Sequence, residues 1–306
     1  MRQTYFGLCD ASAAVMLDET TFVVADDEHN HLRYYRLGRR QSVGSLGLNR
    51  FLEIERHGKE SDVEGAARIG FRTWWIGSHS RNPKGDRQPN RECLFALDLS
   101  HTSEGVRLVP AGRPFRRLLE ALIAADTNWG LGLKQASQMA AEASGGLNIE
   151  GLAAWHKGGL VIGFRNPLIE GKALLVPLLN PEDLIGEDND DPDLLRFGDP
   201  ILLDLGERGI RDLERDGERY LVVAGPTADD GTFRLFRWSG KRGARPRDLG
   251  PRFERSLHPE AVFVLPGERQ AVILSDDGTR EVDGKTCQDL PQAERRFRSL
   301  TVDLPR

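Results

Sequence analysis

Asp62-Val63-Glu64-Gly65-Ala66-Ala67 is the stretch of sequence that decides the fold, because the chain repeats it. It returns as Asn148-Ile149-Glu150-Gly151-Leu152-Ala153 and, more faintly, as His258-Pro259-Glu260-Ala261-Val262. After each copy comes an apolar run that ends in a small residue: Trp74-Trp75-Ile76-Gly77, Leu160-Val161-Ile162-Gly163 and Ala271-Val272-Ile273-Leu274-Ser275. Repetition of a unit with several strands indicates an array of equivalent modules.

Alignment of the repeated phrase divides the chain into five modules, which open at residues 9, 62, 148, 209 and 258. Each module has apolar and aromatic runs separated by Gly, Pro, Asp and Asn, a pattern typical of consecutive strands and turns. A fourth strand follows in several modules, for instance at residues 106–109 and 201–205. Repeated four-stranded units are typical of a β-propeller. We therefore predict an all-β fold, one β-propeller domain over residues 1–306 with five four-stranded blades; six blades stay open if the inserted region hides a degenerate module.

The two ends of the chain are expected to meet in the fifth blade. Residues 300–304 can form its third strand and residues 4–8 its outer strand, which would close the ring. One stretch departs from the pattern: residues 114–146 are predicted as a helical insertion between blades two and three. Apolar residues recur there at helical spacing, Pro114 suits a first helical turn, and a second helical piece is expected at residues 134–143. The insertion is expected to cap one face, where it either shapes a pocket or covers apolar surface.

Composition narrows the class of protein. The chain has 306 residues, 39% hydrophobic and 29% charged, with a net charge of −5, which argues against a nucleic-acid partner. We interpret the acidic residues 182–193 as a solvated loop. Cys9, Cys93 and Cys287 are far apart and predict neither a disulfide framework nor a zinc site. No apolar run is long enough to span a membrane, and the first residues lack a cleavage site. We expect a cytoplasmic protein without a membrane partner.

Phrases along the whole chain resemble a bacterial family known as domain of unknown function 3616, and more distantly the phytase-like esterase propellers. The phrases that carry the resemblance are Asp62-Val63-Glu64-Gly65, Ile76-Gly77-Ser78-His79-Ser80-Arg81-Asn82, Asn148-Ile149-Glu150-Gly151-Leu152, Ile162-Gly163-Phe164-Arg165-Asn166-Pro167, Arg196-Phe197-Gly198-Asp199-Pro200, Trp238-Ser239-Gly240, His258-Pro259-Glu260 and Ser275-Asp276-Asp277-Gly278. The resemblance implies a propeller. It implies no established activity.

The three repeated glutamates are the first candidates for chemistry. The first strand of each propeller blade lines the central channel, so Glu64, Glu150 and Glu260 should converge near its mouth. Carboxylates that close need a proton or a cation between them. Ca²⁺ or Mg²⁺ would meet this need, with Asp62 and Asp276 as further ligands. Alternatively, these acids accept hydrogen bonds that hold the ring together, and Asp276-Asp277-Gly278 is an ordinary turn.

Arginines and asparagines at the same mouth suggest an anionic ligand. Arg211 stands where other modules have glutamate, and it can pair with one of the acids or bind a phosphate or carboxylate. Arg81-Asn82-Pro83 and Arg165-Asn166-Pro167 form a second internal repeat, which serves either substrate binding or turn formation. The loops near the mouth also carry acids at residues 26–28.

His79 and His258 are the histidines placed to move a proton, although a rim histidine also serves as a loop hydrogen-bonder. The chain has no nucleotide-binding motif and no nucleophile elbow, so no nucleotide cofactor is expected.

Two hypotheses about function follow from these candidate residues. One is a metal-dependent hydrolase of a small anionic ester or phosphoester, with Glu64, Glu150, His79 and His258 catalytic and Arg81, Asn82, Arg165, Asn166 and Arg211 binding substrate. The other is a non-catalytic module that binds a metabolite or a protein partner.

Overall fold

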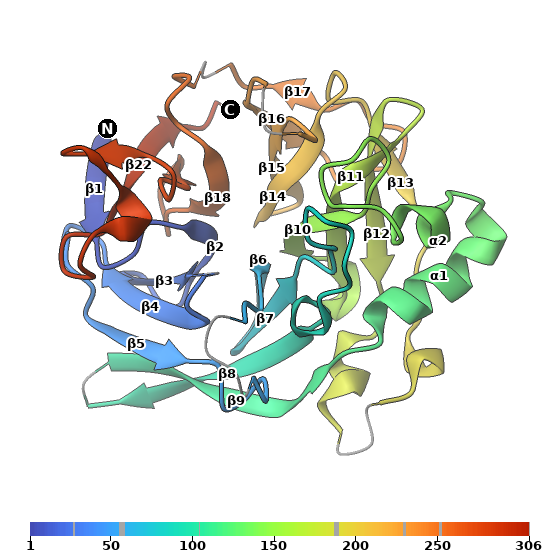
Figure 1. Ribbon diagram of the computed structural model, residues 1–306, viewed down its shortest axis with the longest axis horizontal. Helices are drawn as coiled ribbons and strands as arrows, with labels where there is room; N and C mark the ends of the chain where they lie inside the picture. The colour runs from blue at the N-terminus through green and yellow to red at the C-terminus, as the bar shows by residue number, and fades with distance from the viewer. Residues whose placement is uncertain are drawn as a thin grey trace.

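A ring of five four-stranded antiparallel sheets forms the protein, as the computed structural model shows in Figure 1. The structure describes residues 1–26, 28–54, 59–103, 105–186, 190–228, 231–250 and 253–305. Each sheet is one blade, and its strands run in order from the centre of the ring to its edge. The predicted five-bladed β-propeller is confirmed. Asp27 and residues 187–189, which we had placed in loops, lie outside the described residues.

The strands of the five blades have the following bounds. Blade one contains β2 (Ala11–Met16), β3 (Thr21–Asp26), β4 (His31–Arg36) and β5 (Gly44–Gly47). Blade two contains β6 (Val63–Ile69), β7 (Arg72–Gly77), β8 (Leu94–Thr102) and β9 (Gly105–Phe115). Blade three contains β10 (Asn148–Ala154), β11 (Leu160–Ile169), β12 (Lys172–Leu178) and β13 (Ile201–Leu203). Blade four contains β14 (Gly209–Asp216), β15 (Arg219–Gly225), β16 (Arg234–Trp238) and β17 (Arg247–Asp248). Blade five contains β18 (Pro259–Val264), β19 (Gln270–Ser275), β22 (Arg296–Asp303) and β1 (Arg2–Phe6).

Apolar side chains fill the space between neighbouring blades. Five buried clusters lie at the five interfaces of the ring, so every blade packs on both of its faces. Trp74 and Trp75 illustrate the strand alternation, because these neighbours in β7 belong to clusters on opposite faces of blade two. This packing on both faces explains why the middle strands read as continuous apolar runs.

Blade five joins the two ends of the chain. β1 pairs with β22 from Arg2 opposite Leu300 to Phe6 opposite Arg296, as the sequence predicts. The same closure brings Cys9 beside Cys287, and the two form a disulfide across 278 residues of sequence. Our prediction that the cysteines form no disulfide was wrong, because separation in sequence says nothing of neighbours in a closed ring. Disulfides persist mainly in oxidising compartments, so a cytoplasmic location stays a prediction that this bond does not favour.

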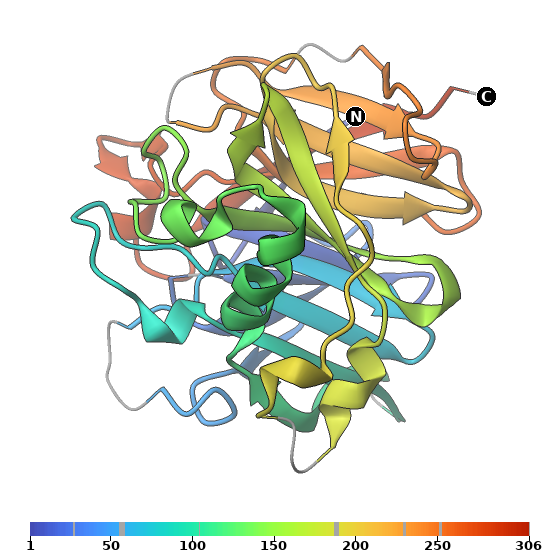
Figure 2. The same cartoon turned by 90° about the vertical axis from the view of Figure 1, so that its right-hand side faces the viewer.

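Two helices, α1 (Leu118–Trp129) and α2 (Leu133–Ala136), follow β9. Figures 1 and 2 show them at the outer edge of the ring, beside blades two and three, whereas we expected them to cap one face. Their buried residues, among them Leu118, Leu122 and Leu133, complete the apolar cluster between these blades.

The sequence misplaced the bounds of these helices. Pro114 belongs to β9, which still pairs with β8 at Phe115, so Pro114 does not begin a helix. The second helical piece is shorter than residues 134–143, because α2 ends at Ala136 and turns follow. The remaining short elements are the hairpin β20 (Glu281–Val282) and β21 (Lys285–Thr286), and five 3-10 turns, η1 (Pro89–Arg91), η2 (His156–Gly158), η3 (Pro181–Ile185), η4 (Pro192–Leu194) and η5 (Cys287–Asp289). Within the described ranges, no helix is long and apolar enough to cross a membrane.

Candidate functional site

A β-bulge occurs at the same place in the innermost strand of every blade. In blade two the pairing passes from Val63 opposite Gly77 to Gly65 opposite Ile76, and Glu64 is left out of the ladder. The residues that the bulges leave unpaired at equivalent positions are Ser12, Glu64, Glu150, Arg211 and Glu260. A bulge re-aims a side chain that the regular pleat would place elsewhere. The repeated glutamate is thus the bulged residue of its blade.

The glycine after the glutamate lets the innermost strands approach closely. A Cβ atom at Gly65 would lie 2.9 Å from Cβ of Leu152 in blade three, and one at Gly151 would lie 2.7 Å from Ile210 Cγ2 in blade four. These distances are shorter than van der Waals contact. The repeated Glu-Gly pair therefore combines a re-aimed charge with tight packing between blades.

Arg211 lies between two of the bulged glutamates. Its Nε donates to Glu260 Oε2 at 3.0 Å, and its Nη2 donates to Glu260 Oε1. The same Nε lies 2.9 Å from Glu150 Oε2. All three side chains are at least nine-tenths buried. Blades three, four and five are thus tied together by one guanidinium group.

Arg165 completes this channel network, which we define as Glu150, Arg165, Arg211 and Glu260. Its Nη1 donates to Glu150 Oε1 at 3.1 Å, and Asn148 Nδ2 donates to the same oxygen at 2.7 Å. Its other nitrogens donate to the carbonyl oxygens of Pro226 and Ala228 and to Glu142. Burial raises the pKa of the Glu150 carboxyl, and Arg211 and Arg165 oppose that rise. Burial also opposes the charge of Arg211, but the two glutamates outweigh it and raise the pKa of Arg211.

This pairing places two arginines where the sequence analysis expected a metal ion. Arg165 and Arg211 pair with Glu150 and Glu260, and both arginines oppose the rise in the pKa of Glu150 that burial and the charge of Glu260 cause. Glu64 is half-buried and its charge acts on Arg211, but Asp62 belongs to a separate group, where Ser78 donates to it and Arg91 lies 2.9 Å away. Among the described residues, no three His, Cys, Asp or Glu side chains are grouped so that they could hold a metal ion.

The predicted asparagines and Arg81 hold loops. Asn82 accepts hydrogen bonds from the backbone N–H groups of Lys84 and Asp86, and these bonds stabilise the turn, which is one of the two roles expected from the sequence. Asn166 donates to the carbonyl oxygens of residues 141 and 143, and Arg81 donates to Ser137 O at 2.7 Å. These two side chains therefore fasten the segment around α2 to blades two and three.

Asp10, which the sequence analysis did not single out, lies against the turn that contains Asp276. A Cβ atom at Gly278 would come 1.7 Å from Asp10 Oδ1, so the carboxyl group touches this turn directly. Gln288 Nε2 donates to Asp10 Oδ1 at 2.7 Å. Burial, together with the charges of Asp276 and Glu28, raises the pKa of Asp10 to about 8. Asp10 therefore keeps its proton at pH 7.

Asp276 is the partner of Asp10 at this mouth. Its Oδ1 accepts from the backbone of Gly278 at 2.8 Å, and burial raises its pKa while His258 and Arg211 oppose the rise. His258 is exposed and lies beside Asp276 on the rim. A signal for Asp10 was present in the sequence, because Asp10-Ala11-Ser12 aligns with Asp62-Val63-Glu64 and with His258-Pro259-Glu260.

His79 is buried and lines a different cavity, of about 370 Å³, between blade two and α1. Arg81 lines the same cavity, but no member of the channel network does. The structure thus separates the predicted site residues into two groups. His258, Asp276 and the channel network lie at the mouth, whereas His79 and Arg81 lie at the insertion.

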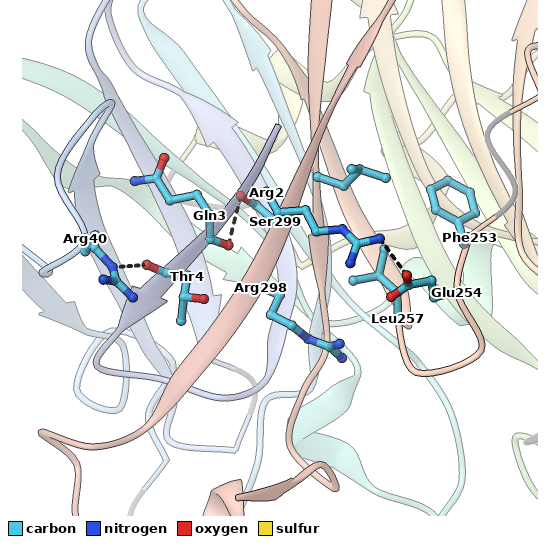
Figure 3. A pocket seen from close by; sticks show the side chains of 10 residues that line it. Arg2, Gln3, Thr4, Arg40, Phe253, Glu254, Leu257, Arg298 and Ser299 are labelled. Atoms are coloured by element: carbon cyan, nitrogen blue, oxygen red, sulfur yellow. Dashed lines mark hydrogen bonds and ion pairs between the residues drawn. The ribbon is translucent and has the colours of Figure 1, made fainter.

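A larger cavity, of about 460 Å³, opens beside the outer strands of blade five (Figure 3). Three arginines line it, and each is engaged. Arg2 pairs with Glu254 at 2.7 Å, Arg40 Nε donates to Thr4 O at 3.2 Å, and Arg298 donates to Asp277. Each arginine of this cavity thus has a described hydrogen-bond partner, which is a carboxylate for Arg2 and Arg298 and a carbonyl oxygen for Arg40.

Comparison with known proteins places the chain in one family. The family described as "Protein of unknown function (DUF3616)" matches residues 10–105 and 115–271. No curated protein matches the chain.

Solved structures resemble the fold at low identity. The Cps50 (Swd1) β-propeller domain of Myceliophteria thermophila is 9% identical, with a TM-score of 0.37 over 99% of this chain and 100% of that one. A luciferin-regenerating enzyme is 11% identical, with a TM-score of 0.46 over 99% and 95%. Kuenenia stuttgartiensis hydrazine synthase is 10% identical, with a TM-score of 0.42 over 98% and 88%. These structures include enzymes and a domain described only as a propeller, so the similarity carries no argument about function.

Proposed function

Since the chain belongs to the DUF3616 family, whose description names no activity, we propose from the channel mouth that it is a hydrolase with Asp10 and Asp276 as its acid–base pair. The observation that carries the proposal is the placement of Asp10, buried against the turn that contains Asp276, where burial and the Asp276 charge raise its pKa to about 8. A carboxyl group with a pKa of about 8 is a proton donor at neutral pH. Two interacting carboxyl groups hold one proton between them over a wide pH range, which leaves the other as a base.

The reaction follows from these two protonation states. The Asp276 carboxylate removes a proton from a water molecule while the water oxygen forms a bond to the electrophilic carbon of the substrate. The bond from that carbon to the leaving oxygen breaks, and Asp10 gives its proton to this oxygen. Asp276 then holds a proton and Asp10 is ionised, and transfer of one proton through solvent restores the pair. Every atom in this step comes from the substrate, water and the two carboxyl groups.

The substrate class is a small polar molecule with an ester or acetal bond. Such bonds break more readily when the leaving oxygen receives a proton. The charged residues at the mouth do not require an anionic substrate, because Arg165 and Arg211 are already paired with carboxylates. The exposed ring of His258 is placed to contact the substrate at the rim. This proposal keeps the hydrolase of the sequence analysis but assigns its chemistry to different residues and routes no step through a metal ion.

A panel of nitrophenyl esters, glycosides and phosphates tests the proposal with the purified chain. We expect turnover of one class, with a rate that falls as the pH rises through about 8, where Asp10 loses its proton. Asp10→Asn should lower kcat at least a hundredfold, as expected for loss of a general acid. Asp204→Asn, an exposed matched control on blade three's outer side, should leave the rate unchanged. Turnover that Asp10→Asn does not slow would refute the role of this pair.

The second candidate is a binding module without turnover. The pairing of Glu150 and Glu260 with Arg165 and Arg211 favours it, because charges that pair across three blades have a structural use. If no substrate class is turned over by protein that is folded and monodisperse, this candidate replaces the hydrolase. A screen of metabolites by thermal shift would then be the appropriate measurement.

A further inference from the structure

The cavity between blade two and the helical insertion, which we call the insertion pocket, is lined by many cations. Its lining includes Arg81, Arg87, Arg116, Arg117 and Lys134. Only two carboxylates, Glu92 and Glu120, line it as well. The cavity holds about 370 Å³, which is within the usual size range of small-molecule sites.

The carboxylates neutralise two of these cations and leave three. Arg87 forms a two-pronged pair with Glu92, with both distances at 2.6 Å. Arg117 forms a similar pair with Glu120, at 2.9 and 2.7 Å. These are the paired cations of the pocket.

The other three cations have no carboxylate partner in the part of the chain that the structure describes. Arg81 donates to the carbonyl oxygens of Ser137 and Gly85, and Arg116 to those of Pro89 and Leu52. Lys134 is exposed and its ammonium group makes no hydrogen bond or ion pair with a described residue. The pocket therefore carries an excess of positive charge.

His79 supplies an independent sign of a ligand. Its side chain is 3% exposed, and its Nε2 has no hydrogen-bond partner among the described residues. Nδ1 lies 2.8 Å from Gly77 O, and since a carbonyl oxygen only accepts, Nδ1 carries a proton. Burial lowers the pKa of His79, while Glu92 and Arg116 act on the ring with opposite signs. The neutral ring thus presents Nε2 as a buried acceptor without a donor, which is costly unless something fills it.

The backbone is also suited to an anion here. Arg116, Arg117, Leu119 and Glu120, which line the pocket, stand at the start of α1. No side chain caps this helix at Arg117. The first N–H groups of a helix lack partners within it and favour negative charge.

We infer that the insertion pocket binds a phosphate monoester, with Arg116 and Lys134 neutralising the phosphate oxygens and His79 Nε2 accepting a hydrogen bond from the protonated one. A phosphate group in its monoanionic form supplies both the charge and the O–H that the pocket lacks. The volume leaves room for an organic group on the ester. This site is independent of the acid–base pair at the channel mouth, so neither proposal depends on the other.

Isothermal titration with phenyl phosphate tests the inference, with inorganic phosphate as a second arm and phenol as the uncharged control. We expect saturable binding of phenyl phosphate with one site per chain, and no binding of phenol. Tighter binding of phenyl phosphate than of inorganic phosphate would identify a monoester site. Equal binding of the two would overturn the monoester and leave a site for free phosphate. No saturable binding of either would overturn the site itself.

Variants show whether the binding belongs to this pocket. Lys134→Gln should weaken phenyl phosphate binding about tenfold, since a charge-assisted contact is lost. His79→Asn should weaken it too, because asparagine tolerates the left-handed backbone at this position (φ 54°) but lacks Nε2. Affinity of the wild type should fall from pH 6 to pH 8 as the phosphate loses the proton that it gives to Nε2. Lys285→Gln, at an exposed lysine in the β20–β21 hairpin, is the matched control. Binding that Lys134→Gln and Arg116→Gln leave unchanged would refute the assignment.

Discussion

The channel network and the insertion pocket both hold arginines close to carboxylates, but they differ in how far the charges are matched. In the channel network, Arg211 and Arg165 contact Glu150 and Glu260, and the carboxylates come from blades three and five. In the insertion pocket, Lys134 has no described partner and His79 has an unused buried acceptor. The ion pairs of the channel network hold three blades together, whereas the insertion pocket has cations without a described carboxylate partner and a buried acceptor, on which our inference of a ligand rests. The repeated sequence phrase belongs to the matched region, so repetition here marks architecture more than chemistry.

The largest effect is expected from removal of the charge that the channel network shares. Arg211→Met leaves Glu150 without one of its two arginines and Glu260 without its described partner. Loss of one partner of a buried ion pair costs about 3–5 kcal/mol of unfolding free energy. Urea unfolding followed by tryptophan fluorescence would measure it. The control is Arg219→Met at the exposed start of β15, which should change stability by less than about 0.5 kcal/mol. Equal unfolding free energies of Arg211→Met and Arg219→Met would contradict a structural role of the channel network.

A smaller loss is expected from Glu150→Gln, which keeps the shape of the side chain. Asn148 and Arg165 donate to Oε1 of the carboxylate, and Arg211 Nε lies 2.9 Å from its Oε2 as an ion-pair partner. An amide accepts through one oxygen only and places an NH₂ group against an arginine, so we expect a loss of about 1–3 kcal/mol. A catalytic role for Glu150 makes the opposite prediction, with lost activity and an unchanged or higher Tm. The same unfolding assay, run beside the activity panel, separates these two outcomes.

The repeat was sufficient to predict the five blades and their closure, because each copy carries the same alternation of strands and turns. It could not predict the disulfide between Cys9 and Cys287, since nothing local marks a contact across 278 residues. The pairing of Arg211 with the acids was one of two alternatives from the sequence. The sequence could not decide between these alternatives, because the pairing depends on the bulges, which bring residues from three blades within hydrogen-bonding distance.

The chemistry of the site was harder to predict than the fold. Asp10 escaped notice because its module has Ser12 where others have glutamate, and its raised pKa depends on burial by a turn at the other end of the chain. His79 was expected at the channel because it follows β7 directly. Its cavity exists only because residues 116–138 fold back against blade two, a contact that no local pattern encodes.

The third predicted effect on stability depends on pH and concerns Asp10, which lies outside the channel network. The pKa of Asp10 is about 8 in the folded protein and is ordinarily 3.8. The folded state therefore binds more protons than the unfolded state between these values, and stability falls as the pH rises from about 4 to about 8. Asp10→Asn removes this dependence. Its Tm should move above that of the wild type as the pH approaches 8, since one unit of pKa corresponds to about 1.4 kcal/mol. Burial also raises the pKa of Asp212 and of the half-buried Glu214, so the variant is compared with the wild type at each pH. A constant difference in Tm from pH 4 to pH 8 would contradict the protonated state of Asp10.

The smallest effect on stability should come from Lys134→Gln, and this small effect sharpens the contrast between the two regions. Lys134 is exposed and its ammonium group makes no hydrogen bond or ion pair with a described residue, so the unfolding free energy should change by less than about 0.5 kcal/mol. The Lys134 ammonium group lines the same pocket as the cations Arg81 and Arg116. Its removal therefore lowers the positive charge of the pocket and the repulsion that this charge causes. Thermal unfolding without ligand should therefore give the same Tm as the wild type, or a slightly higher one. With phenyl phosphate present the order should reverse, because the wild type gains more from binding. If Lys134→Gln destabilised the free protein as Arg211→Met is expected to do, the charges of the insertion pocket would be structural as well, and the distinction between matched and unmatched regions would fail.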